Sequence, residues 1–343
     1  MRYSRNTESF RHFRNINRLQ GALGIILCAV TFLTGCSPTY PKEKFRESII
    51  KVCKAEYKLD VKVETIGRTI AIYLPLEDLI DFTFAITKQA SEKINDVILS
   101  VSRVALSTDA EFDFYCVIAH DVRIPEIQIV IIKSVDDVKR FLLNDISRGE
   151  YSKRMLVDIR FSPQAQKERE IKEIFNKVRV DKKWQEQVMN DFFRSEPTAL
   201  SDIGYWGGHF YIKDISLAEF LAEQIANRFR LAFREEKGLL DAYLVKSSKG
   251  SFTTKGGQRI FKLELLVEYK PLEVSDKKAA SDVIFETALK IASHVIHNYR
   301  FNDFDRFEIL NQQDNSVITL SSEELESFRT KKLKLEEITE RVK

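Results

Sequence analysis

The feature that most constrains the fold is an order of helices and strands that the sequence predicts twice. Apolar residues recur with a helical period in some segments and alternate in others, as amphipathic helices and half-buried strands require. The first copy is a helix over 42–58, strands at Val61–Thr65 and Thr69–Leu74, a helix over 86–107, strands over 111–119 and 127–133, and a short helix after Ser134. The second copy is a helix over 217–236, strands over 242–248 and 259–269, a helix over 279–300, strands over 304–311 and 316–320, and a short helix after Ser321.

Residue matches that fall in the same order favour a diverged repeat over chance similarity between two stretches of one class. The matches are Leu59-Asp60 with Leu240-Asp241, Tyr73 to Glu77 with Tyr269 to Glu273, Phe112-Asp113 with Phe304-Asp305, and Ser134 and Phe141 with Ser321 and Phe328. They predict an α+β fold of two diverged α-β-β-α-β-β repeats. Its antiparallel sheets are covered by helices, and a helical segment lies between the repeats.

The remaining segments follow from the same patterns. The connecting segment holds an expected strand at Met155–Phe161, helices over 164–179 and 182–193, and a strand over 209–214. We expect a signal segment over 1–35, a first repeat over 36–150, a connecting segment over 151–215, a second repeat over 216–330 and a charged, solvated tail over 331–343.

Two short motifs predict local structure. Ser134 with Asp137, and Ser321 with Glu324, have the spacing of capping boxes, in which the hydroxyl and the acid satisfy amides at a helix start. The glycine-rich stretch over 250–257 lies between two expected strands and lacks the order of a phosphate-binding loop. It therefore predicts a long hairpin loop.

The amino-terminal segment has the order of a secretory signal. Residues 1–20 are polar and basic, and residues 21–33 carry no charge. A bilayer-spanning helix needs about 20 apolar residues, so this run is too short to cross. The run is followed by Leu33-Thr34-Gly35-Cys36, which resembles the lipobox of bacterial membrane-anchored lipoproteins. No family is recognised in the rest of the chain.

The resemblance implies cleavage before Cys36 and attachment of lipid, including palmitate, to this residue. The alternative is an uncleaved signal anchor with an incidental cysteine. By the sorting rule of such lipoproteins, Ser37 in place of aspartate favours an outer membrane, with the protein facing the periplasm. Otherwise we expect the outer face of the plasma membrane. Extended, Ser37 to Tyr40 reach on the order of 15 Å, which keeps the body close to the membrane.

Charge and cysteine usage narrow the function classes further. The chain has a formal charge of +3, but five arginines and one glutamate in residues 1–35 supply +4, which leaves about −1 for the body. We therefore expect no nucleic-acid partner. Cys53 and Cys116 lie on apolar patterns and are expected to be small buried residues. A disulfide between them is an alternative, because an export compartment permits it.

Candidate ligands and aromatics are sparse. His294 and His297 fall on the polar side of a helix, and Asp303 with Asp305 falls at a turn, so we expect no bound metal or other cofactor. Gly204 to Gly208 enclose Tyr205 and Trp206, which predict either a ligand or partner surface or a loop tucked into the core.

Three functions follow as hypotheses, with a non-enzymatic role favoured over an enzyme. The first is an envelope lipoprotein that binds an envelope protein or helps assemble a membrane complex. A solid core with an exposed aromatic patch would favour it. The second is a lipid- or small-ligand-binding lipoprotein, which an apolar pocket would favour. The third is a hydrolase that uses carboxylates or a metal, which acids clustered with His120 or His209 would favour.

Overall fold

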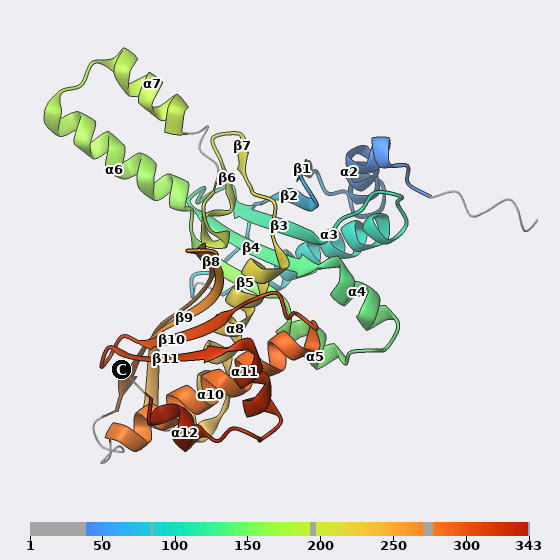
Figure 1. Ribbon diagram of the computed structural model, residues 1–343. Helices are drawn as coiled ribbons and strands as arrows, with labels where there is room; N and C mark the ends of the chain where they lie inside the picture. The colour runs from blue at the N-terminus through green and yellow to red at the C-terminus, as the bar shows by residue number, and fades with distance from the viewer. Residues whose placement is uncertain (1–38, 84, 193–196, 271–276, 342–343) are drawn as a thin grey trace, which may run out of the picture.

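The computed structural model describes residues 39–341 except 84, 193–196 and 271–276, and it has the predicted α+β architecture (Figure 1). The first repeat contains η1 (Lys42–Lys44), α2 (Phe45–Tyr57), β1 (Lys62–Ile66), β2 (Thr69–Leu76), α3 (Lys88–Leu106), β3 (Phe114–Asp121), β4 (Ile127–Ser134), α4 (Val135–Leu142) and α5 (Arg148–Lys153). The connecting segment contains β5 (Leu156–Phe161), α6 (Pro163–Val178), α7 (Lys182–Phe192), η2 (Leu200–Asp202), β6 (Gly204–Trp206) and β7 (His209–Tyr211). The second repeat contains α8 (Leu217–Glu235), α9 (Lys237–Ala242), β8 (Tyr243–Lys255), β9 (Gln258–Tyr269), α10 (Lys277–Asn298), β10 (Arg306–Asn311), β11 (Ser316–Ser321), α11 (Ser322–Arg329) and α12 (Leu335–Thr339).

The two repeats have the same sheet topology, which confirms the predicted order of elements. Strands β1 to β5 form one sheet in chain order, and the other sheet has the order β11-β10-β9-β8. Hairpin pairs are antiparallel, but β2 pairs with β3, and β9 with β10, in parallel. The parallel pairs arise because α3 and α10 cross over the sheet and return the chain to the same end. The sheets are therefore mostly, but not wholly, antiparallel.

Equivalent Arg–Asp contacts occur in both repeats, at the end of the sheet where the two parallel strands begin. The Asp113 N–H donates to the Arg68 carbonyl, and the Asp305 N–H donates to the Arg259 carbonyl, each at 2.9 Å. The Arg68 guanidinium lies 2.9 Å from the Asp113 carboxylate, and Arg259 is also paired with Asp305. The repeated Phe-Asp motif thus fixes the register between a hairpin and the strand that follows the crossover helix.

The first sheet is covered on both faces. Ile70, Ile72 and Leu74 point toward α2 and α3, whereas Ala71 and Tyr73 join a core that includes α8, the hairpin β6–β7 and the second repeat. The Phe114 ring on β3 lies 5.0 Å from the Phe220 ring on α8, between ring centroids. A single hydrophobic core therefore continues from the first repeat into the second.

Three local predictions need correction. The 250–257 stretch is not a long loop, because β8 continues through Lys255 and turns at Gly256 and Gly257. The strand expected over 209–214 ends at Tyr211 and pairs with β6. The tail is helical in part but is not wholly solvated, because Ile338 on α12 is buried in the core of the second repeat.

The two predicted capping boxes have different outcomes. Ser321 accepts from the Glu324 N–H at 3.1 Å, and Glu324 accepts from the Ser321 N–H at 2.9 Å. At the other helix start the Ser134 side chain makes no capping hydrogen bond. Its expected partner Asp137 instead accepts from buried Arg154 at 2.8 Å. The second box is confirmed, and the first is wrong because a tertiary ion pair takes the acid.

Asp137 and Arg154 belong to a buried polar network that joins the repeats. Tyr299, which follows α10, donates its hydroxyl hydrogen to Asp137, and Gln224 on α8 donates to the Arg154 carbonyl at 2.8 Å. Glu150 accepts from Arg154 at 2.8 Å and from Arg228 on α8 at 2.7 Å. Burial raises the pKa of Glu150, but the two guanidinium groups outweigh burial and leave that pKa below its usual value. The contacts of Arg228 and Tyr299 in this network therefore form only when the repeats are docked.

We expect Arg154→Met to lower the free energy of unfolding by about 3–5 kcal/mol, because it leaves the buried Asp137 carboxylate without its ion-pair partner. Arg103→Met is the matched control, since Arg103 forms a half-exposed pair with Glu56 and its loss should cost no more than about 1 kcal/mol. Urea denaturation of both variants measures the difference. Equal losses would contradict the importance of the buried network.

Gly250 on β8 is required by the close approach of α8. A Cβ atom at this position would lie 1.9 Å from the Ala222 carbonyl oxygen, which is backbone and cannot rotate away. Gly238, in α9, has no atom within 4 Å of its Cβ position. Glycine at 250 therefore serves helix–sheet packing.

We expect Gly250→Ala to destabilise the protein by about 1–3 kcal/mol or more, because the helix must move off the strand. Gly238→Ala should be neutral or slightly stabilising, because alanine has the higher helix propensity. Thermal unfolding followed by circular dichroism compares the two. A Gly250→Ala midpoint equal to that of Gly238→Ala would rule out the packing explanation.

Candidate functional site

The proposed lipid attachment residue Cys36 lies outside the described residues, but the described residues that follow it are hydrogen-bonded to the body. The Tyr40 N–H donates to the Ser107 carbonyl at 3.2 Å, and the Lys42 N–H donates to Asp109 at 2.7 Å. The chain therefore enters the body at the carboxyl end of α3. Cys36 precedes Tyr40 by four residues, which reach at most about 14 Å.

Tyr205, one of the two aromatic residues of the loop from Gly204 to Gly208, is buried in the core. Its ring stacks on Tyr73 with 3.7 Å between centroids, and its hydroxyl accepts from Lys62 at 2.6 Å. Trp206 is partly exposed, and its indole N–H donates to Glu168 on α6 at 2.5 Å. This pair of aromatics therefore docks the β6–β7 hairpin and α6, and Tyr205 offers no ligand or partner surface.

Cys53 and Cys116 are both buried and unbonded, so the alternative of a disulfide is wrong for this structure. Cys53 faces the core under α2 and α3, and Cys116 faces the core on the opposite side of the first sheet. The sheet between them excludes a bond. Burial raises the pKa of both thiols, that of Cys116 to about 12, which makes them poor nucleophiles.

The histidine and aspartate residues considered as metal ligands or catalytic groups are either paired with other side chains or exposed. Asp303 and Asp305 both pair with Arg259, and His294 and His297 lie exposed on α10. The His120 ring is hydrogen-bonded to the Tyr73 hydroxyl at 2.6 Å. Within the described ranges, no three His, Cys, Asp or Glu side chains are grouped to hold a metal ion.

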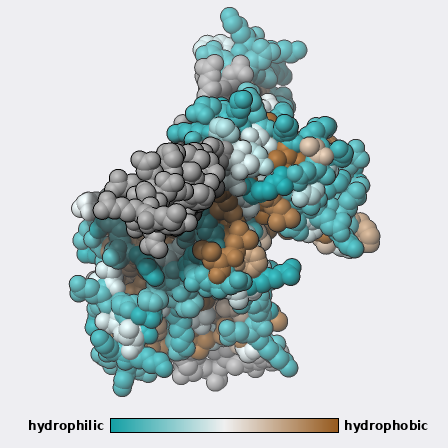
Figure 2. Space-filling view, turned by 90° about the vertical axis from the view of Figure 1, so that its right-hand side faces the viewer, coloured by the Kyte–Doolittle hydropathy of each residue, from teal (hydrophilic) through white to brown (hydrophobic). Residues whose placement is uncertain are grey.

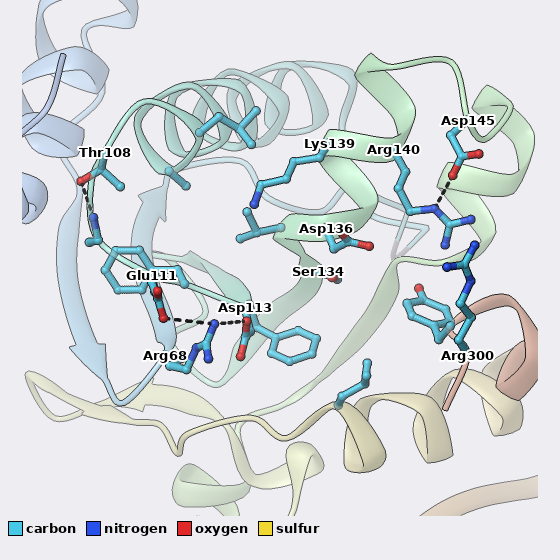
Figure 3. Close-up of a pocket in the computed structure, with 18 of the residues that line it drawn as sticks. Arg68, Thr108, Glu111, Asp113, Ser134, Asp136, Lys139, Arg140, Asp145 and Arg300 are labelled. Carbon is cyan, nitrogen blue, oxygen red and sulfur yellow. Dashed lines mark hydrogen bonds and ion pairs between the residues drawn. The ribbon is translucent and has the colours of Figure 1, made fainter. Parts of the chain in front are cut away.

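A polar cleft of about 780 Å³ lies where the repeats meet (Figure 3). Arg68 lies between Glu111 and Asp113, at 3.7 and 2.9 Å. Arg140 is paired with Asp145 at 2.6 Å. Four basic and four acidic side chains line the cleft: Arg68, Lys139, Arg140 and Arg300, and Glu111, Asp113, Asp136 and Asp145. Because these charges balance and largely pair with one another, the cleft has no clear preference for a ligand.

A second hollow, of about 830 Å³, is an apolar groove between α3, α4 and α5. Figure 2 looks onto the side of the molecule that carries α4 and shows hydrophobic side chains gathered there. Leu99 and Leu142 are 59% and 61% exposed at its rim. Its other apolar lining residues are Ile98, Leu106, Val138, Phe141 and Met155. This volume and character are typical of small-molecule sites.

The groove opens beside the edge strand β5. Met155 lines the groove, and Val157, Ile159 and Phe161 continue from it with the alternation of a strand. All three are between about two fifths and one half exposed, because α2 and α3 do not cover the fifth strand of the sheet. Val157 and Phe161 are about 13 Å apart at the rise of a β-strand. The exposed apolar surface is therefore elongated, which suits a chain-like ligand.

The polar residues of the groove are unbalanced in charge. Arg103, Lys133 and Arg148 line it, whereas none of its described lining residues is Asp or Glu. Arg103 is paired with Glu56 outside the groove, at 2.6 Å. Lys133 is only 7% exposed and donates to the Tyr151 hydroxyl at 2.7 Å. Burial lowers the pKa of Lys133 to about 8. The groove thus combines apolar walls with basic side chains and no acidic side chain among its described lining residues.

Two features of the sequence point to this groove, although neither is a catalytic motif. Lys133 continues the inward alternation of Ile127, Ile129 and Ile131, so the pattern itself places a lysine on a buried face. Leu99 is a large apolar residue that lies off the core stripe of α3. A buried charge and an exposed leucine are both exceptions to burial preferences.

No family model, curated protein or solved structure matches the chain. Within the described ranges, no helix combines the length and apolar character that crossing a bilayer requires.

Proposed function

We propose that this protein is a lipid-anchored, non-enzymatic lipoprotein of the bacterial cell envelope that binds an apolar, chain-like ligand at the membrane surface. The observation that supports a ligand is the groove between α3, α4 and α5, which has apolar walls and a volume of about 830 Å³. The lipobox at Leu33 to Cys36 carries the anchor. Ser37 favours an outer membrane, with the body in the periplasm.

The groove and the proposed anchor lie close together along the chain. Ser107, which accepts the hydrogen bond from Tyr40, also lines the groove. A lipid on Cys36 would therefore hold the membrane within about 14 Å of the Tyr40 backbone. Two or more acyl chains anchor a protein stably, so such an anchor would keep the groove beside the bilayer. A membrane-derived acyl chain is therefore the ligand that this position suits best.

We expect Cys36→Ala to abolish incorporation of labelled palmitate and to leave the uncleaved precursor, because both steps require this cysteine. Cys28→Ala is the control, since Cys28 lies in the apolar run that cleavage removes. The measurement is metabolic labelling followed by gel electrophoresis. Palmitate label retained by Cys36→Ala would remove the anchor from the proposal.

We expect Leu99→Asp and Leu142→Asp to weaken binding of the neutral fluorescent probe N-phenyl-1-naphthylamine at least about tenfold, because a charge replaces apolar contact at the rim. Leu244→Asp is the control, because Leu244 is similarly exposed on β8, outside the groove. All three changes are made in the full chain carrying Cys36→Ala. Probe binding that is equal in the four proteins would contradict a ligand site in the groove.

A second candidate is docking of an envelope protein on the arm formed by α6 and α7, which projects from the body (Figure 1). Ile174, Val178, Trp184 and Val188 are exposed on this arm. Exposed aliphatic and aromatic side chains of this kind are typical of protein interfaces. This candidate becomes the leading one if the groove variants leave probe binding unchanged.

A further inference from the structure

We propose that the ligand of the groove is a long-chain carboxylate, whose carboxylate binds Lys133 and whose hydrocarbon chain lies along the apolar walls toward Leu99 and Leu142. This inference rests on the proposed ligand-binding function and names the class of ligand. It is carried by where the positive charge lies in the groove and by what surrounds it.

The cation lies deep in the groove, and the apolar rim lies at its mouth. Lys133 is 7% exposed, whereas Leu99 and Leu142 are each about 60% exposed. An amphiphile must therefore enter with its polar end first. Such an entry selects a small polar end, because a bulky headgroup would have to pass between the walls. A carboxylate is the smallest common anion that ends a hydrocarbon chain.

The surroundings of Lys133 supply no counter-charge from the groove lining. Its ammonium donates to the Tyr151 hydroxyl at 2.7 Å and lies 4.1 Å from the centre of that ring. Burial raises the pKa values of Tyr151 and of neighbouring Tyr115, so both phenols stay neutral near pH 7. A buried ammonium whose described acceptor is one neutral hydroxyl gains most from an anion.

The acid that acts electrostatically on Lys133 is hydrogen-bonded to other partners. Asp137 on α4 interacts with Lys133 at longer range, but its oxygens accept from Arg154 and Tyr299 in the network that joins the repeats. Arg148, on α5, adds a second, exposed positive charge to the groove. The field in the groove therefore favours a negatively charged ligand over a neutral one of the same length.

The test compares dodecanoate with dodecan-1-ol, which has the same chain and no charge, by equilibrium dialysis with the full chain carrying Cys36→Ala. We expect dodecanoate to bind roughly 10- to 100-fold more tightly, the range for a hydrogen bond to a charged group. Lys133→Met should remove this preference and keep binding of the alcohol. Lys139→Met is the control, because Lys139 is exposed on α4 and lines the polar cleft.

A pH series on the unsubstituted groove gives a second measurement that needs no folded variant. The Lys133 ammonium loses its proton as the pH rises above about 8, so the preference for dodecanoate should fall between pH 7 and pH 10. Arg103 stays charged over this range, the phenols of Tyr115 and Tyr151 stay largely protonated because their pKa values are raised, and Asp137 stays paired. Binding of dodecan-1-ol should not change.

The outcomes separate this inference from the function on which it rests. Equal affinity for dodecanoate and dodecan-1-ol, or a preference that persists in Lys133→Met and at pH 10, would overturn the carboxylate and leave an apolar ligand site. Absence of binding by both molecules would overturn the site as well.

Discussion

The buried ion pair between Arg154 and Asp137 is the constraint on which the rest of the structure depends. Removing a guanidinium from water costs several kcal/mol, which is offset only where every partner is in place. The guanidinium is paired with acids on α4 and α5, while Gln224 on α8 donates to the Arg154 carbonyl and Tyr299 after α10 donates to Asp137, so the network is complete only in the docked body. Because α4 and α5 are also walls of the groove, the same network holds the ligand site in shape.

Most elements of the fold could be predicted because their apolar residues repeat with a clear period. The parallel pairing of β2 with β3 could not, since it depends on the path of α3 rather than on alternation within either strand. The role of Asp137 was also hidden. A capping acid and the acid of a buried ion pair look the same in sequence, and only the distant Arg154 distinguishes them.

The site was less predictable than the fold, for a related reason. The groove lies between α3, α4 and α5, and no single segment of the sequence records how these helices are placed. The burial of Tyr205 was equally hidden in the sequence, because it depends on stacking against Tyr73, which is far away in the chain. Lys133 is the exception: a lysine in a buried alternation of isoleucines can be read from sequence alone, and it marks the floor of the groove.

The proposed anchor and the proposed ligand both require that the polar end of the ligand enters the groove first. Lipids in a bilayer present their polar ends to the water, so a protein tethered at the surface meets the head of a ligand before its chain. A cation on the floor and leucines at the mouth accept a molecule in that order. Each methylene exposed to water costs about 0.8 kcal/mol. A tether that starts beside the groove shortens the path over which the ligand's methylenes are exposed to water. A protein that collected its ligand from bulk solution would gain nothing from such a tether.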